Sequence, residues 1–277
     1  MKLGYNPTLI QAELEEELRY CEYYGFDAIE LRIEKLKDYF TRNSMQDLKD
    51  FFARSSLKPL SLNAVEEILF ADKETKRKND EDLEFLFEVG RELNIQDIVI
   101  VPSFHETQYS LEEIKSESVK VLKDIAARAK KFDMRLAYEF IGNPSACVNN
   151  FKQCYEIVEA VNADNVGISL DFFHFYAMNS NIEDLRNADI NKIFLVHIND
   201  ADYYPPGSLR EKEDRLFPGE GAIPIHNYLD ILNGKNYQGL VSVELFRPEY
   251  DTWDVETFIR TVKEKTAPFL NSIMQSN

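Results

Sequence analysis

Cysteine is scarce in this sequence, and the few cysteines it has are not paired. The 277 residues include only three cysteines, and none of them lies in a C-x-x-C pair. A disulfide framework and a structural zinc ribbon are therefore excluded, because both need paired cysteines at short spacing. We expect free thiols in a reducing compartment, which is the cytoplasm.

Long apolar runs and an excess of basic residues are also missing. No run approaches the ~20 apolar residues that cross a bilayer, and the first residues, 1–7, lead into an acidic stretch rather than the apolar core of a signal peptide. Lys and Arg number 32 against 49 Asp and Glu, a net charge of −17. We expect neither a nucleic acid nor a membrane as partner, because both present anionic surfaces.

Short apolar segments alternate with amphipathic segments from end to end. The expected strands are 3–5, 28–31, 59–62, 98–101, 135–140, 166–170, 193–196 and 240–243, and the expected helices are 12–24, 45–53, 80–93, 111–132, 150–161, 182–188, 225–232 and 255–270. The strands are apolar and β-branched rather than alternating, which is typical of a parallel sheet covered by helices. Eight such units with no break in composition predict one (β/α)₈ TIM barrel over residues 1–277, an α/β fold.

A doubly wound open sheet is the alternative fold. Such a sheet more often has a glycine-rich turn after an early strand, and residues 3–7 do not form one. The irregular segment 199–221 is longer than an ordinary connection and predicts a functional lid, with a solvated loop as the alternative. The mixed-charge run 73–78 is expected to be a solvated loop.

Four consecutive expected strands end in residues that can bind a metal ion: Glu139, Asp171, His197 and Glu244. The carboxyl ends of barrel strands form the functional face. Three carboxylates that converge there repel one another unless a cation lies between them. The pattern predicts one divalent ion, with a structural polar cluster as the alternative. Oxygen donors with one imidazole favour Mn²⁺, while Zn²⁺, Co²⁺ and Mg²⁺ are also compatible.

Three further residues are candidates to bind substrate oxygens. His174 follows Asp171 by three residues, and a buried core histidine is the alternative. Arg215 and Arg247 lie in or after polar loops, where a surface ion pair is the alternative for each. A metal ion at this rim would polarise a carbonyl beside a hydroxyl, and a neighbouring carboxylate could then move a proton between the two carbons.

With these residues in place, the sequence resembles the xylose-isomerase-like barrels along its whole length. The four strand-end residues and the string D-R-x-x-P-G-x-G at 214–221 are shared widely in that superfamily. The strings F-H-F-Y-A-M at 173–178 and S-V-E-L-F-R-P-E-Y at 242–250 are more specific. They resemble the branch that isomerises keto-inositols in inositol catabolism.

The resemblance implies an activity and a role for each matching residue. It implies conversion of 2-keto-myo-inositol into 1-keto-D-chiro-inositol through a cis-enediolate. Glu139, Asp171, His197 and Glu244 would bind the ion, and Glu139 and Glu244 would also move the proton. His174 and Arg215 would contact substrate oxygens.

Several alternatives stay open on the same scaffold. A ketose 3-epimerase, a hydroxypyruvate isomerase or an inosose dehydratase would use the same four residues, and so would a metal-dependent sugar-binding protein without turnover. The endonuclease branch is set aside, because its members carry histidines where this chain has Asn63 and Ser103. The sequence leaves a homo-oligomer open.

Overall fold

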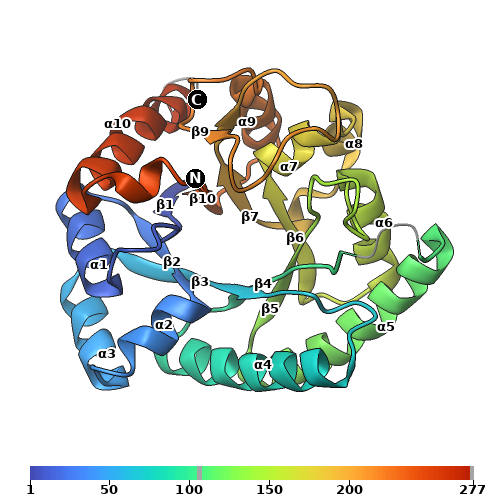
Figure 1. Ribbon diagram of the computed structural model, residues 1–277, viewed down its shortest axis with the longest axis horizontal. Coiled ribbons are helices and arrows are strands. Elements are labelled where there is room, and N and C mark those ends of the chain that lie inside the picture. Colours follow the sequence, from blue (N-terminus) through green and yellow to red (C-terminus); the bar gives the residue numbers. More distant parts are fainter. Residues whose placement is uncertain (105–107, 275–277) are drawn as a thin grey trace.

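The computed structural model describes residues 1–104 and 108–274. Eight parallel strands close into a barrel in the order β1-β10-β7-β6-β5-β4-β3-β2, and helices form a ring around them (Figure 1). The strands are β1 (Lys2–Tyr5), β2 (Ala28–Arg32), β3 (Lys58–Val65), β4 (Asp97–Ile100), β5 (Arg135–Glu139), β6 (Val166–Asp171), β7 (Ile193–Ile198) and β10 (Leu240–Val243). The predicted TIM barrel is confirmed.

The helices fill the connections between the strands. They are α1 (Leu14–Tyr23), α2 (Ile33–Tyr39), α3 (Met45–Arg54), α4 (Lys73–Leu93), α5 (Leu111–Ala129), α6 (Phe151–Val161), α7 (Phe172–Ala177), α8 (Ile182–Asn187), α9 (Ile225–Gly234) and α10 (Val255–Met274). Short 3₁₀ turns lie at η1 (Lys130–Phe132), η2 (Ile190–Lys192) and η3 (Tyr250–Thr252). Among the described residues, no helix combines the length and apolar composition that a membrane span requires.

The expected solvated loop at 73–78 is wrong, because these residues form the first turns of α4. The Asp72 side chain caps the helix by accepting a hydrogen bond of 2.8 Å from the backbone N–H of Thr75. Lys78 forms an ion pair with Asp82 at 2.9 Å, one turn further along the helix. A side-chain cap and an ion pair at this spacing both stabilise a helix. The charged run therefore forms the exposed face of a helix.

Several strands alternate between polar residues on the inner face of the barrel and apolar residues on its outer face, a pattern that was not predicted from the sequence. The inner polar residues stand two apart along their strands, as in Glu30 and Arg32, Ser61 and Asn63, or Ser169 and Asp171. All six of these side chains are buried, and the two faces of a strand alternate with period two. The polar inner residues lie toward the carboxyl ends of the strands and line the mouth of the barrel.

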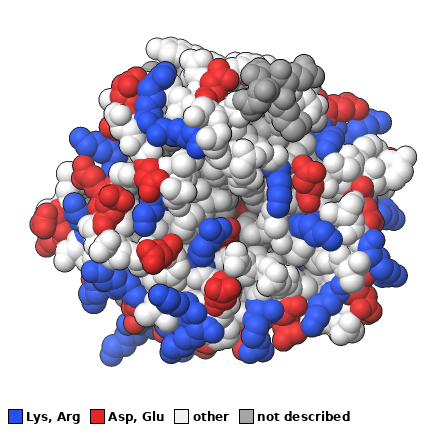
Figure 2. Space-filling view, turned by 180° about the vertical axis from the view of Figure 1, so that it is seen from behind, with Lys and Arg blue, Asp and Glu red and all other residues white. Residues whose placement is uncertain are grey.

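Charged residues of both signs share the outer surface. In Figure 2, which shows the molecule from behind, Lys and Arg side chains alternate with Asp and Glu side chains around the edge. On this face, charges of neither sign gather in one large patch.

One buried carboxylate outside the mouth makes folding sensitive to pH. Glu17 on α1 is fully buried, accepts a hydrogen bond of 2.9 Å from the Tyr5 hydroxyl and lies 3.1 Å from the Lys35 ammonium. Burial raises the pKa of Glu17 from 4.5 to about 7, against the opposing effect of Lys35. A carboxyl whose pKa is raised by folding stabilises the fold at low pH, and this contribution is lost as the pH rises through the folded value.

The Glu17→Gln variant is therefore expected to gain stability relative to the wild type as the pH rises from 5 to 8. The gain in the free energy of unfolding should be about 2 kcal/mol, because glutamine has no proton to lose. Urea unfolding of both proteins at the two pH values measures it, with Glu16→Gln, at a half-exposed position on the same helix, as the control. If the difference in unfolding free energy between variant and wild type were the same at pH 5 and at pH 8, this prediction would be contradicted.

Candidate metal centre and active site

Four neighbouring strands bring the predicted metal ligands together. Glu139 and Asp171 are the last residues of β5 and β6, His197 lies in β7, and Glu244 directly follows β10. Asp171 and His197 are register partners across β6 and β7. One ligand atom from each of the four lies within 4.8 Å of the others, and all four residues are buried. Such a set can hold one metal ion.

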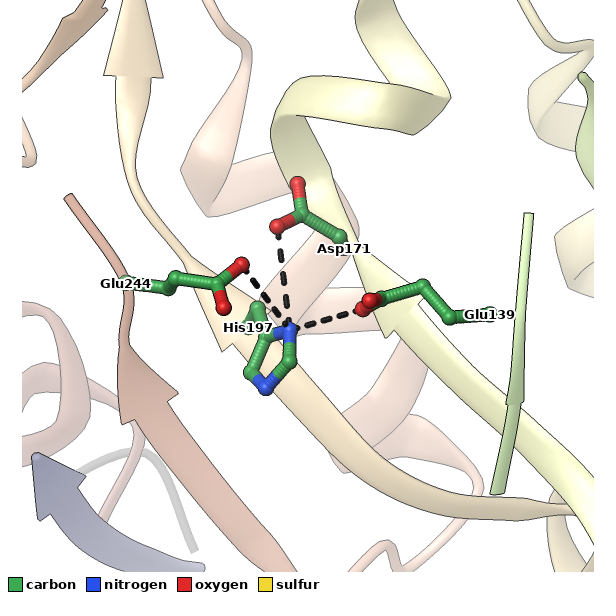
Figure 3. A group of neighbouring side chains, drawn as sticks. All are labelled: Glu139, Asp171, His197 and Glu244. Carbon is green, nitrogen blue, oxygen red and sulfur yellow. Dashed lines mark hydrogen bonds and ion pairs between the residues drawn. The ribbon is translucent and has the colours of Figure 1, made fainter. Parts of the chain in front are cut away.

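The imidazole of His197 lies at the centre of the cluster. Its Nδ1 is 2.8 Å from Glu139 Oε1, 3.4 Å from Glu244 Oε2 and 3.7 Å from Asp171 Oδ2, and Figure 3 shows the three carboxylates pointing at this one nitrogen. Burial lowers the pKa of His197, but the surrounding carboxylates outweigh it and hold the pKa well above its ordinary value. The surroundings of Nδ1 therefore attract positive charge.

Two buried arginines balance part of the negative charge. Arg215 Nη1 donates a hydrogen bond of 2.6 Å to Asp171 Oδ2 and lies 3.3 Å from Glu244 Oε2. Arg32 Nη1 lies 3.7 Å from Glu244 Oε1. The Phe246 ring contacts both guanidiniums, at 5.1 Å from Arg32 Cζ and 5.5 Å from Arg215 Cζ.

The charges of the site fit a divalent cation. The buried ionisable set has two arginines, Arg32 and Arg215, and four carboxylates, on Glu30, Glu139, Asp171 and Glu244. With the His197 ring neutral, as metal binding requires, these six groups carry a net charge of −2 when all are ionised, which one divalent ion would balance. Burial, with Glu139 and Asp171, raises the pKa of Glu244 to about 8 despite the opposing effect of His197 and Arg215. The carboxylates therefore repel one another without a cation, and their oxygen donors with one imidazole suit a divalent metal.

His174 and Arg215 present two hydrogen-bond donors to the same place. His174 is the third residue of α7, and its Nδ1 accepts a hydrogen bond of 3.0 Å from the backbone N–H of Gly142. The neutral ring then carries its proton on Nε2, which lies 3.3 Å from Arg215 Nη2. Two donors cannot satisfy each other, so both need an acceptor such as a substrate oxygen.

Close packing at Gly142 fixes the position of His174. A Cβ added to Gly142 would lie 2.7 Å from the Cα and 2.8 Å from the carbonyl oxygen of His174. The Gly142→Ala variant must push α7 away, so we expect it to lose about 1–3 kcal/mol of unfolding free energy and to raise KM. Gly234→Ala is the matched control, because no atom outside its own stretch of helix lies within 4 Å of the added carbon. Equal stability and equal KM for the two variants would rule out this role of Gly142.

Arg247, the third residue predicted to bind substrate, has polar and aromatic partners on its own loop. Its Nε donates a hydrogen bond of 3.1 Å to Glu249, and its guanidinium packs over Tyr250. It lines a cavity of about 480 Å³ that Arg32 and Phe246 also line. Substrate binding by Arg247 stays a prediction.

The segment 199–221 is built around one carboxylate. Asp200 Oδ1 accepts hydrogen bonds from the backbone N–H groups of Ala201 and Ile223, and Oδ2 accepts one from Gly219, all at 2.9 Å. The short strands β8 (Asp200–Ala201) and β9 (Arg215–Leu216) pair antiparallel. This arrangement delivers Arg215, fully buried, to the metal cluster. The function of the segment as a lid stays a prediction.

Several residues that contact the cluster were missed by the sequence analysis. Asn6 Nδ2 donates to Glu244 Oε1 at 2.8 Å, Asn199 Nδ2 donates to Asp171 Oδ2 at 3.1 Å, and Glu30 Oε1 lies 3.0 Å from His197 Nε2. Arg32, already described beside Glu244, was missed as well. The sequence did contain a signal for them, because polar residues recur at every second position near the carboxyl ends of the strands. It was overlooked because the strands were interpreted as apolar throughout.

Comparisons with known proteins run along nearly the whole chain. Residues 18–265 match the family model described as the xylose isomerase-like TIM barrel. The chain is 45% identical over 271 residues to an inosose isomerase of Halalkalibacterium halodurans, covering 96% of this chain and 95% of that protein. It is 44% identical over 271 residues to an inosose isomerase of Bacillus subtilis (strain 168), covering 96% of both. A crystal structure of the IOLI protein with a bound zinc atom is similar with a TM-score of 0.94 and 40% identity, covering 99% of both chains.

Proposed function

Because the chain belongs to the xylose isomerase-like TIM barrel family, we propose that it is an inosose isomerase. Its reaction is the conversion of 2-keto-myo-inositol into 1-keto-D-chiro-inositol, an intramolecular oxidoreduction in inositol catabolism. The observation that carries the proposal is the identity of 45% over 96% of the chain to an enzyme of that name. The three cysteines are buried and none of them is joined in a disulfide, which suits the cytoplasmic location that we also propose.

Glu139, Asp171, His197 and Glu244 hold one divalent cation in this proposal. Manganese is favoured by three oxygen donors and one imidazole, and zinc, the metal of the IOLI structure, cobalt and magnesium suit the same donors. When bound, the cation supplies Lewis-acid polarisation of the substrate carbonyl and its neighbouring hydroxyl. The net charge of −2 on the buried groups supports a divalent ion.

The two glutamates move the proton that the isomerisation requires. Glu139 is the last residue of β5 and Glu244 directly follows β10, so their carboxylates approach the centre from different sides (Figure 3). A carboxylate takes the proton from the hydroxyl-bearing carbon, which leaves a cis-enediolate. A proton is then returned to the former carbonyl carbon, and the hydroxyl proton shifts to the other oxygen. No atom is gained or lost overall.

His174 and Arg215 hold the substrate oxygens during this transfer. Nε2–H of His174 and the Nη2 group of Arg215 are 3.3 Å apart, so one oxygen can accept a hydrogen bond from both. Donors that are already in place stabilise the negative charge that develops on an enediolate oxygen. Arg247 is proposed to contact a more distant substrate hydroxyl.

Product analysis tests the assignment. The manganese-loaded protein is incubated with 2-keto-myo-inositol, with a ketohexose and with hydroxypyruvate, and the products are identified by ¹³C NMR. We expect the 1-keto isomer from the inosose and much slower reaction of the other compounds. A diketone would identify a dehydratase, an inverted hydroxyl beside the keto group an epimerase, and unchanged inosose would overturn the proposal.

A further inference from the structure

One buried carboxylate at the centre of the barrel has no part in the proposed mechanism. Glu30 lies in the middle of β2 and is fully buried. Its Oε1 lies 3.0 Å from His197 Nε2, and its Oε2 accepts a hydrogen bond of 2.6 Å from the Ser61 hydroxyl. An ionised carboxylate is costly to bury without a strong partner, so the contact with His197 calls for an explanation.

We propose that Glu30 is a positioning residue that fixes the tautomer and the orientation of His197 for metal binding. This inference rests on the proposed function, because it assigns His197 Nδ1 to the metal ion. A carboxylate that accepts the N–H of a metal-binding imidazole directs the lone pair of the other nitrogen at the ion and makes that nitrogen a better donor. Glu30 stands in this position on the side of the ring away from the cluster.

The geometry shows which competing state Glu30 disfavours. Glu139 Oε1 lies 2.8 Å from His197 Nδ1, so without a metal ion a proton on Nδ1 would form a good hydrogen bond to Glu139. In the neutral ring that tautomer would leave a lone pair on Nε2 facing the Glu30 carboxylate at 3.0 Å, which is repulsive. Glu30 therefore favours the proton on Nε2 and keeps Nδ1 free for the ion.

Ser61 restrains Glu30 in turn. Its hydroxyl occupies Oε2, and Ser61 is register partner of Glu30 between β3 and β2. The chain of contacts thus runs from the β3 hydroxyl through the β2 carboxylate to the β7 imidazole. The carboxylate also contributes one of the four negative charges that favour a divalent ion.

Metal affinity tests the inference with a readout other than activity. Zn²⁺ and Mn²⁺ are titrated into metal-free wild type and Glu30→Gln against a chromophoric chelator. We expect the variant to bind both ions about 10- to 100-fold more weakly. Asp97→Asn is the matched control, because Asp97 is a buried strand carboxylate that pairs with Arg135 at 2.7 and 2.8 Å instead. It should lose stability and keep the wild-type metal affinity.

The failure of this inference can be told from the failure of the proposed function. Wild-type affinity in a folded Glu30→Gln variant overturns the role of Glu30 and leaves the metal site standing. A wild type that binds no divalent ion overturns both. Should the variant not fold, ¹⁵N NMR of His197 in the metal-loaded wild type decides, with a proton on Nε2 expected and a proton on Nδ1 contradicting the inference. Ser61→Ala, which removes only one hydrogen bond, should weaken binding less than Glu30→Gln.

Discussion

The Glu244→Gln variant should convert 2-keto-myo-inositol about 10³-fold more slowly than the wild type, which is within the range that a positioned acid or base contributes. Glutamine has the same shape and keeps one oxygen, which can face the metal site in place of Glu244 Oε2 at the cost of the hydrogen bond from Asn6 to Oε1, but it cannot take up a proton. The loss should fall on kcat, while KM changes little, because proton transfer rather than substrate binding is removed. Steady-state kinetics at saturating manganese measures both constants.

Glu139→Gln should behave in the same way, since Glu139 lies across the cluster from Glu244 and is the second group that moves a proton. The exposed Glu81→Gln, whose partner is Arg77 at 2.6 Å, is the control and should have wild-type kcat. If both variants bound the sugar with unchanged affinity and the wild type itself showed no turnover, the protein would be a metal-dependent sugar-binding protein. Near-wild-type kcat in both variants would exclude these glutamates as proton-transfer groups.

Removal of the metal ion should lower turnover at least as much as either glutamine substitution does. Dialysis against a chelator should lower turnover by about 10³-fold or more, since the substrate carbonyl is then not polarised. The carboxylates would also be left close together in a buried site, so the melting temperature should fall. At an ion concentration of 1,000 times Kd, binding contributes about 4 kcal/mol to the stability.

The control for this experiment is the return of the ion. Readdition of Mn²⁺ should restore turnover and melting temperature together. In an Asp171→Asn variant, readded Mn²⁺ should raise both by less, because Asp171 is both a proposed ligand and the partner of Arg215. Full turnover of a protein shown to be metal-free would contradict the proposed role of the cluster.

The barrel and the position of the cluster were predictable because they depend on local patterns. Apolar segments followed by amphipathic segments predict the eight strand and helix units. Polar residues at the carboxyl ends of these strands must lie at the same end of the barrel. Glu139, Asp171, His197 and Glu244 were found in this way. The short helix α7 was missed, because it has only six residues and begins directly at the strand end, where the Asp171 side chain caps it.

Residues that act through contacts across the barrel could not be predicted from local sequence patterns. Glu30 lies in the middle of a strand, and only the closure of the barrel brings it to His197, 167 positions further along the chain. Arg215 lies in an irregular segment where a surface ion pair was the alternative, and its burial depends on the fold around Asp200. The period-two pattern of polar residues inside the strands indicates such contacts, but it does not say which residues meet.

The most direct test of the central claim is an NMR assay in D₂O, with metal-reconstituted protein and 2-keto-myo-inositol. Deuterium uptake at the two carbons between which the proton moves is followed together with the identity of the product, in the same sample. Proton transfer by carboxylates that exchange with solvent predicts the 1-keto isomer together with deuterium on the carbon that receives the proton. If the protein binds both the metal and the sugar but shows no deuterium uptake and forms no 1-keto isomer, the isomerase assignment is contradicted.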